Sequence, residues 1–210
     1  MSDVRELGPG ESHLAVLALS ERRRWSLVGW GRLWGLGCWC GMMSSMSLVI
    51  REMTLDEVDL IIDYFHGSTP EHLETMGVDP TRLPTREDWR EWYVAEYGRP
   101  VRERSTLLVV WELDGVAVGF SSADRIVYGE QANMHLHVID PQHRGSGIGS
   151  ASVRKTADLY FAALELKLLF CEPNAFNVAP NRTLQSAGFR YVKTYKTVPG
   201  PLNYHQAVTR

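Results

Sequence analysis

The feature that most constrains this chain is a glycine-rich segment at residues 138–149, which reads VIDPQHRGSGIG. It overlaps the end of a mostly apolar run at residues 134–139 that is typical of a strand. The run stops at Asp140 and Pro141, because proline lacks a backbone donor and turns the chain away from a sheet. After the glycines, apolar side chains recur at helical spacing over residues 153–164. The sequence therefore predicts a strand, a glycine loop and a helix, in that order.

A strand, loop and helix of this kind are typical of an anion site, because free backbone N–H groups collect at the positive end of the helix. Two nucleotide-binding loops are excluded by the residues present. A Walker loop needs a lysine directly after its last glycine, whereas the first lysine here is Lys155, inside the predicted helix. A dinucleotide loop needs its third glycine where this chain has Ser150. The pattern that fits is R-x-x-G-x-G, formed by Arg144, Gly147 and Gly149.

A second motif lies at residues 177–189, which read NVAPNRTLQSAGF. Asn177 precedes a helical stretch, and Gly188 is expected to end that helix because glycine adopts positive φ without strain. The two motifs, in this order, resemble those of the GCN5-related N-acetyltransferase (GNAT) superfamily. The resemblance covers residues 47–210 and is nearest to the branch that acetylates ribosomal proteins and small amines.

The elements around these motifs agree with that resemblance. Helices are expected to begin after Thr54, Thr69 and Thr85, each of which is a good N-cap. Asp114 and Gly115 predict a two-residue hairpin. Strands are predicted at residues 48–51, 106–113, 116–122, 133–139, 166–171, 189–198 and 202–208. The resemblance implies an α/β (α+β) fold with a mixed central sheet of six to seven strands. That sheet should splay at the acetyl-CoA site and be flanked by helices.

The resemblance also implies acetyl-CoA as cosubstrate, bound without a metal. Loop amides would hold the pyrophosphate, while the backbone amides of Val138 and Ile139 would bind pantetheine and polarise the thioester. The expected cofactor-binding residues are Val138, Ile139, Arg144, Gly145, Ser146, Gly147, Ile148, Gly149 and Asn177.

The catalytic base is sought on the strand before the loop. His137 and His135 share one face of that strand, and either imidazole could accept the amine proton, directly or through water. The alternative is that both rings simply pack or form hydrogen bonds. Glu130, in a turn, is a weaker candidate. The family commonly places a tyrosine acid seven residues after the motif asparagine, but Leu184 stands there. Cys171 suggests an acyl-cysteine route. The alternative is that it is a buried thiol with a structural role.

The acceptor pocket is expected from the helix after Thr85. Trp89, Trp92 and Tyr93 lie on one face of that helix, where they either pack in the core or form an apolar wall for the acceptor. A closed wall favours a small primary amine, acetylated by direct attack in a ternary complex. The alternatives are a protein N-terminus or lysine as acceptor, and a catalytically silent acyl-CoA-binding module, which Leu184 would favour.

Composition limits the remaining possibilities. A net charge of −3 indicates neither a nucleic-acid nor a membrane partner. An odd set of three cysteines, including Cys38 and Cys40, indicates a reducing cytoplasm rather than a disulfide framework. Residues 1–46 differ in composition from the acetyltransferase domain at 47–210. We expect a disordered extension or a mis-annotated start there, rather than the signal peptide suggested by Arg22, Arg23 and Arg24 before an apolar stretch. Oligomeric state is left open, a homodimer included.

Overall fold

The computed structural model describes residues 47–196 and 202–210. These residues belong to one unit, Ser44–Arg210. The predicted extension at 1–46, with Cys38 and Cys40, lies outside the described residues. So does the predicted turn around Pro199.

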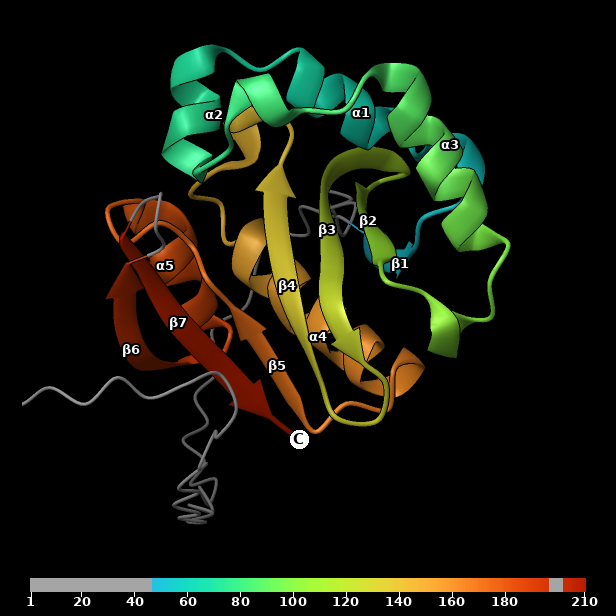
Figure 1. Ribbon diagram of the computed structural model, residues 1–210. Helices are drawn as coiled ribbons and strands as arrows, with labels where there is room; N and C mark the ends of the chain where they lie inside the picture. The colour runs from blue at the N-terminus through green and yellow to red at the C-terminus, as the bar shows by residue number, and fades with distance from the viewer. Residues whose placement is uncertain (1–46, 197–201) are drawn as a thin grey trace, which may run out of the picture. The chain divides into compact units, whose positions relative to one another are not determined.

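Seven strands form one mixed sheet with the order β1-β2-β3-β4-β5-β7-β6 (Figure 1). Neighbouring strands of the described chain run antiparallel except for β4 and β5, which are parallel. This confirms the mixed, open sheet predicted from the sequence. The strands are β1 (Leu48–Glu52), β2 (Leu107–Leu113), β3 (Val116–Val127), β4 (Gln131–Val138), β5 (Leu168–Cys171), β6 (Arg190–Lys196) and β7 (Leu202–Thr209).

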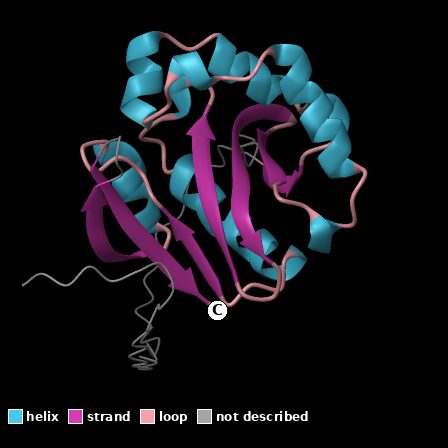
Figure 2. Cartoon of the chain, in the orientation of Figure 1, coloured by secondary structure: helices cyan, strands magenta, loops and turns pink. Residues whose placement is uncertain are grey.

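Five α-helices accompany the described strands (Figure 2). α2 and α3 begin as predicted, since the Thr69 and Thr85 hydroxyls accept backbone N–H bonds from His72 and Asp88. The helix predicted after Thr54 is instead divided into a 3-10 turn and α1. That turn closes with short-range bonds such as Val58 N–H to the Leu55 carbonyl oxygen, at 3.4 Å. The helices are α1 (Asp59–His66), α2 (Pro70–Met76), α3 (Arg86–Tyr97), α4 (Ile148–Ala163) and α5 (Val178–Ser186). None in the described part of the chain is long and apolar enough to span a membrane.

The sheet is buried on both faces at its centre. In β2, Val109 and Trp111 belong to the core beneath α4, whereas Leu108 and Val110 belong to the core beneath α1 and α3. This follows from the alternation of side chains along a strand. The Trp111 indole N–H donates to the Thr156 hydroxyl of α4 at 2.8 Å, which ties that helix to the sheet.

The two parallel strands separate along their length. β4 and β5 pair only where residues 131–133 of β4 meet 168–170 of β5. β4 continues to Val138, which is paired with Gly119 of β3 on the other side. β5 is short because Glu172 and Pro173 follow it, and proline cannot continue the ladder. One edge of β4 is therefore open beyond Asn133, and the splayed sheet implied by the resemblance is present.

Candidate active site

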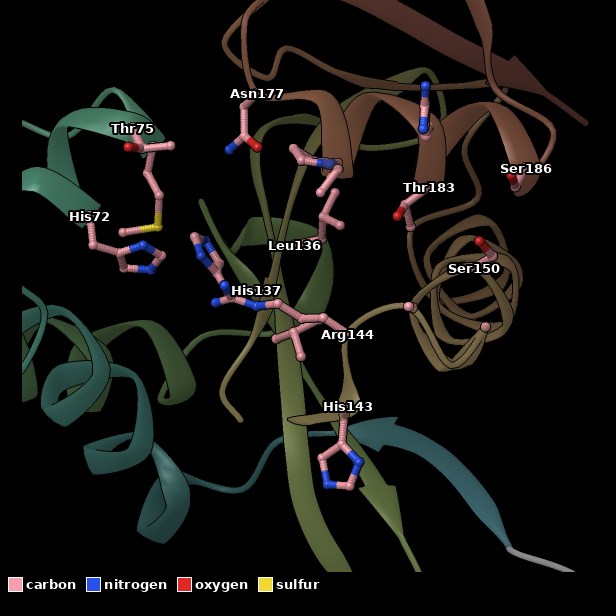
Figure 3. Close-up of a pocket in the computed structure, with 18 of the residues that line it drawn as sticks. His72, Thr75, Leu136, His137, His143, Arg144, Ser150, Asn177, Thr183 and Ser186 are labelled. Atoms are coloured by element: carbon pink, nitrogen blue, oxygen red, sulfur yellow. The ribbon is translucent and has the colours of Figure 1, made fainter. Parts of the chain in front are cut away.

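A cavity of about 410 Å³ lies where β4 leaves β5. This volume is in the range of small-molecule sites. Figure 3 shows side chains from the α2 region, the end of β4, the glycine loop, α4 and α5 converging on it. The lining residues are Tyr64, His72, Thr75, Met76, Leu136, His137, Val138, His143, Arg144, Gly145, Gly147, Gly149, Ser150, Asn177, Ala179, Pro180, Arg182, Thr183 and Ser186.

The glycine loop shapes one wall of the cavity. Gly145 and Gly147 have φ of 77° and 85°, a left-handed conformation that other residues adopt only with strain. Gly147 is the N-cap of α4, so the helix begins at the cavity. A Cβ on Gly149 would lie 3.5 Å from the Thr183 side chain, which shows how closely α4 and α5 approach there. The start of α4, where helix N–H groups lack intrahelical partners, therefore borders the cavity.

The N-terminus of α5 borders the same cavity. Its N-cap is Asn177, whose carbonyl oxygen accepts a bond from the Asn181 side chain at 2.7 Å. Asn181 is buried and also accepts a bond from Gln206 of β7 at 2.7 Å. These bonds fix the start of α5 against the sheet. Two helix N-termini therefore point their partial positive charge at one space.

The charged side chains of the cavity are cationic. Arg144 comes from the loop and Arg182 from α5, and neither forms an ion pair with any residue in 47–196 or 202–210. Among the described residues that line the cavity, none is Asp or Glu. Two unpaired guanidinium groups beside two helix N-termini create a site suited to a multiply charged anion.

A family model described as an acetyltransferase (GNAT) domain matches residues 47–190. The chain belongs to the GNAT family. It is accordingly an N-acetyltransferase by class. A comparison with curated protein sequences gave no significant match.

Solved structures of acetyltransferases share the fold of this GNAT chain. An aminoglycoside acetyltransferase in complex with coenzyme A has 20% identity and a TM-score of 0.60, with 78% of this chain and 95% of that chain covered. The ribosomal-protein acetyltransferase RimL, with coenzyme A, has 14% identity and a TM-score of 0.64, with coverages of 79% and 95%. A chimera of the spermidine N-acetyltransferase SpeG from Vibrio cholerae has 14% identity and a TM-score of 0.62, with coverages of 77% and 95%. At these identities the likeness establishes the fold alone.

The structure brings most of the predicted cofactor residues to the cavity. Val138, Arg144, Gly145, Gly147, Gly149 and Asn177 all line it. Ser146 and Ile148 are not among the described lining residues, and the Ser146 hydroxyl donates to the His143 carbonyl oxygen at 2.7 Å.

The prediction that the Ile139 amide is exposed was wrong. Its N–H donates to the Val118 carbonyl oxygen of β3 at 3.0 Å. Because successive residues of a strand direct their N–H groups to opposite edges, the N–H of Val138 faces the open edge of β4 instead. Of the two amides, only that of Val138 is directed to where a thioester could be polarised.

His137 reaches the cavity with part of its ring, but aromatic side chains surround the rest. Its ring stacks on Phe120 with centroids 4.7 Å apart and lies 5.2 Å from Phe65 and 5.3 Å from Tyr64. Burial, followed by the positive potential of His135 and His72, lowers the pKa of His137 to about 3. The imidazole is thus neutral at physiological pH and a weak proton acceptor. These contacts argue against His137 as the base.

His135 lies on the same face of β4 but is not among the described residues lining the cavity. Its Nε2 is 3.2 Å from the Asp124 carboxylate and 3.0 Å from the Asn133 amide. Burial would raise the pKa of Asp124, but hydrogen bonds from His135 and Asn133 outweigh it and hold that pKa below its usual range. His135 is therefore engaged in a polar cluster beside the cavity. Glu130 pairs with Lys167 at 2.6 Å, also away from the cavity.

The aromatic face of α3 packs mainly in the core. Tyr93 is 4% exposed, and the Trp89 ring lies 5.5 Å from that of Phe65. Trp92 is 43% exposed. None of the three is among the described residues lining the cavity, so an acceptor-binding role for Trp89, Trp92 and Tyr93 stays a prediction.

The helical wall of the cavity comes instead from α1 and α2. Tyr64 lies on α1, and His72, Thr75 and Met76 lie on α2. The N-cap and proline at the start of α2 predicted that helix, but no sequence pattern indicated which of its faces meets the cavity. Arg182, Thr183 and Ser186 of α5 were likewise missed, although the motif after Asn177 already marked their helix as close to the cosubstrate.

Leu184 and Cys171 both belong to the core. Leu184, at the position of the family's tyrosine, is fully buried. Cys171 is 3% exposed, and burial raises the pKa of its thiol to about 12. Since this thiol stays protonated and is not among the lining residues, it is poorly suited to an acyl-cysteine step.

Proposed function

We propose that this protein transfers an acetyl group from acetyl-CoA to a primary amine of a small molecule, by direct attack in a ternary complex. The observation that carries the proposal is the cationic, glycine-lined cavity at the splayed edge of β4.

The cavity's residues fit the cosubstrate. The amides at the starts of α4 and α5 and of the loop from Arg144, with the Arg182 side chain, would bind the diphosphate of coenzyme A, and no acidic residue among the described lining side chains would repel it. The open edge of β4 would bind the pantetheine arm. There the Val138 N–H would stabilise the oxyanion that forms when the amine attacks the thioester carbonyl carbon. Family membership and the coenzyme A held by two structural relatives support the same cosubstrate.

A second surface supports a cationic acceptor. An open groove that also includes Tyr64 in its lining has three carboxylate residues. Glu57 pairs with Arg51 and Asp63 with Arg86, whereas Asp56 forms no ion pair within the described chain. The anion site and the acidic groove share Tyr64, so an amine in the groove would lie next to the cavity that would hold the thioester. The remaining groove residues are Leu60 and Ile139.

The test combines acetyl-CoA titration with thiol release across an acceptor panel. The panel contains polyamines, aminoglycosides, peptides with a free N-terminus and lysine peptides blocked at the N-terminus. We expect heat on acetyl-CoA binding, and thiol release with small polycationic amines. Release with peptides alone would make the protein a protein acetyltransferase. Binding without release from any acceptor would favour a silent acyl-CoA-binding module, and no binding at all would refute the cavity assignment.

A further inference from the structure

Two titratable side chains of the cavity, Tyr64 and His72, form a pair to which cosubstrate binding assigns no role. The Tyr64 hydroxyl lies 2.9 Å from Nε2 of His72. Both side chains line the cavity. The Tyr64 ring packs edge-on against Phe120, with centroids 5.2 Å apart, and also contacts the His137 ring. The pair therefore lies beside the end of β4, where the Val138 amide faces the open edge.

The turn between α1 and α2 holds the pair in place. The Ser68 hydroxyl donates to the Tyr64 backbone carbonyl oxygen at 2.7 Å. The backbone N–H of His72 donates to the Thr69 hydroxyl at 3.3 Å. The Tyr64 hydroxyl also lies 3.4 Å from the Met76 sulfur, a weak acceptor. Its single proton has two partners within reach, and its oxygen can accept a proton from His72. A hydroxyl in this position can pass a proton on.

Other proton donors and acceptors are poorly placed for the reaction. His137 is enclosed by aromatic rings, and His135 is bound to Asp124 outside the cavity. His143 lines the cavity, but in Figure 3 its ring points away from the space that His72 and His137 face, and it lies 4.0 Å from Asp140. Since no described lining residue is Asp or Glu, Tyr64 and His72 are the best placed acid and base.

We propose that Tyr64 and His72 form the proton relay of acetyl transfer, an inference that rests on the proposed function. The amine nitrogen forms its bond to the thioester carbonyl carbon and loses a proton, through water, to Nδ1 of His72. The tetrahedral intermediate then collapses, and the carbon–sulfur bond breaks. Tyr64 donates its hydroxyl proton to the departing sulfur and recovers one from Nε2 of His72. The net result moves one proton from nitrogen to sulfur, with no oxidant or reductant. His72 ends as its Nδ1–H tautomer, and proton exchange with solvent water restores the Nε2–H tautomer before the next turnover.

Arg144 adds an electrostatic reason for this assignment. In Figure 3 its side chain extends toward the space between His72 and His137. Burial raises the pKa of Tyr64, and the positive charge of Arg144 opposes that rise. A cation beside the phenol stabilises the transient tyrosinate, which lowers the barrier to proton donation.

The pair is tested with Tyr64→Phe and His72→Gln, which keep side-chain size and, for glutamine, a hydrogen-bonding group. We expect each to lower kcat by about 100-fold or more, the size of a general acid–base contribution, with acetyl-CoA affinity changed by less than about threefold. Matched controls are Tyr97→Phe, which also loses a hydroxyl bonded within the fold, and His66→Gln on α1, both outside the cavity. The controls should keep wild-type kcat. Retention of more than about a third of kcat by either pair variant would overturn the relay.

Two further readouts separate a relay from a structural role. The pH profile of kcat/KM should differ between wild type and His72→Gln, because the variant lacks a group that exchanges protons during the reaction. The double variant should be no slower than the slower single variant, because both residues serve one proton path. Multiplicative losses, or a pH profile of His72→Gln that matches that of wild type, would contradict the relay.

The outcome is distinguishable from failure of the proposed function. Wild-type protein that releases no thiol with any acceptor refutes the proposed function itself. Wild-type protein that turns over while the pair variants match their controls refutes only the relay. If Tyr64→Phe does not fold, the pH profile and kcat of His72→Gln decide alone.

Discussion

Gly119 of β3 offers a sharp test of how the core supports the active site. It is paired with Val138, the residue whose amide faces the open edge of β4. A Cβ added at Gly119 would clash with the Trp111 ring and lie 2.7 Å from the His137 carbonyl oxygen, closer than real Cβ atoms come. The ring cannot simply move aside, because Trp111 is fully buried and its indole N–H is bonded to Thr156.

The cost of Gly119→Ala follows from these two neighbours. Overpacking a well-filled core costs about 1–3 kcal/mol, and losing the buried indole bond costs about 1 kcal/mol more. Alanine recovers about 0.5 kcal/mol relative to glycine within a strand. We therefore expect the free energy of unfolding to fall by about 1.5–3.5 kcal/mol. The β4 backbone at His137 can instead shift to relieve the clash. That shift would move the adjacent Val138 amide and so raise KM for acetyl-CoA.

The assay is urea unfolding, with KM for acetyl-CoA measured in parallel. The matched control is Gly98→Ala at the end of α3, where φ is −69° and the nearest atom to a Cβ lies at 3.5 Å. That variant should be neutral or more stable by about 0.4–1 kcal/mol, because alanine restricts the unfolded chain. If Gly119→Ala unfolds at the wild-type urea concentration and keeps the wild-type KM, the close approach of β3, Trp111 and β4 has been misjudged.

Three other predictions concern the loop, a surface ion pair and His137. Gly147→Trp should weaken acetyl-CoA binding by at least about tenfold, because a bulky side chain at the start of α4 blocks the approach to its amides. The control in the same calorimetric titration is Gly115→Trp, which is also at positive φ but lies in a hairpin. Equal acetyl-CoA affinities of the two variants would contradict the loop assignment. Hydrogen bonding to Arg51, partly offset by burial, lowers the pKa of Glu57 from 4.5 to about 2, so its stabilisation is present above pH 4.5 and lost as pH falls toward 2. Glu57→Gln should therefore unfold more easily by about 1 kcal/mol at pH 7 and match wild type near pH 2 in urea titrations; a gap independent of pH would be inconsistent with the ion pair. Because the pKa of His137 is lowered to about 3, His137→Phe should leave the pH dependence of kcat/KM unchanged between pH 6 and 9, and loss of its acid limb would make His137 the base after all.

Most of the fold and the conformation of the glycine loop could be predicted from the sequence, because local rules decide them. Glycines at 145 and 147 allow left-handed turns that other residues resist, and both adopt positive φ. The Asp114 and Gly115 hairpin and the caps at Thr69 and Thr85 are likewise decided by neighbours in sequence.

The acceptor side of the site depends on contacts between distant segments, and there the sequence was insufficient. Helical spacing assigns Phe65 to the apolar stripe of α1, but Tyr64 beside it reaches the cavity because α1 lies next to Phe120 and His137 of the sheet. By strand periodicity, His137 and His135 lie on the same face of β4. Aromatic rings nevertheless enclose His137, whereas His135 contacts the Asp124 carboxylate.

The sequence by itself therefore determined the order of strand, glycine loop and helix, since each depends on residues adjacent in the chain. Only the tertiary structure decided which edge of β4 is open, and so which amide, Val138 or Ile139, faces a ligand. It also decided which histidine has a hydroxyl partner in the cavity. The physical reason is that hydrogen-bond direction, burial and electrostatic surroundings are set by the elements packed against a residue, and the spacing of residues along the chain does not specify those elements.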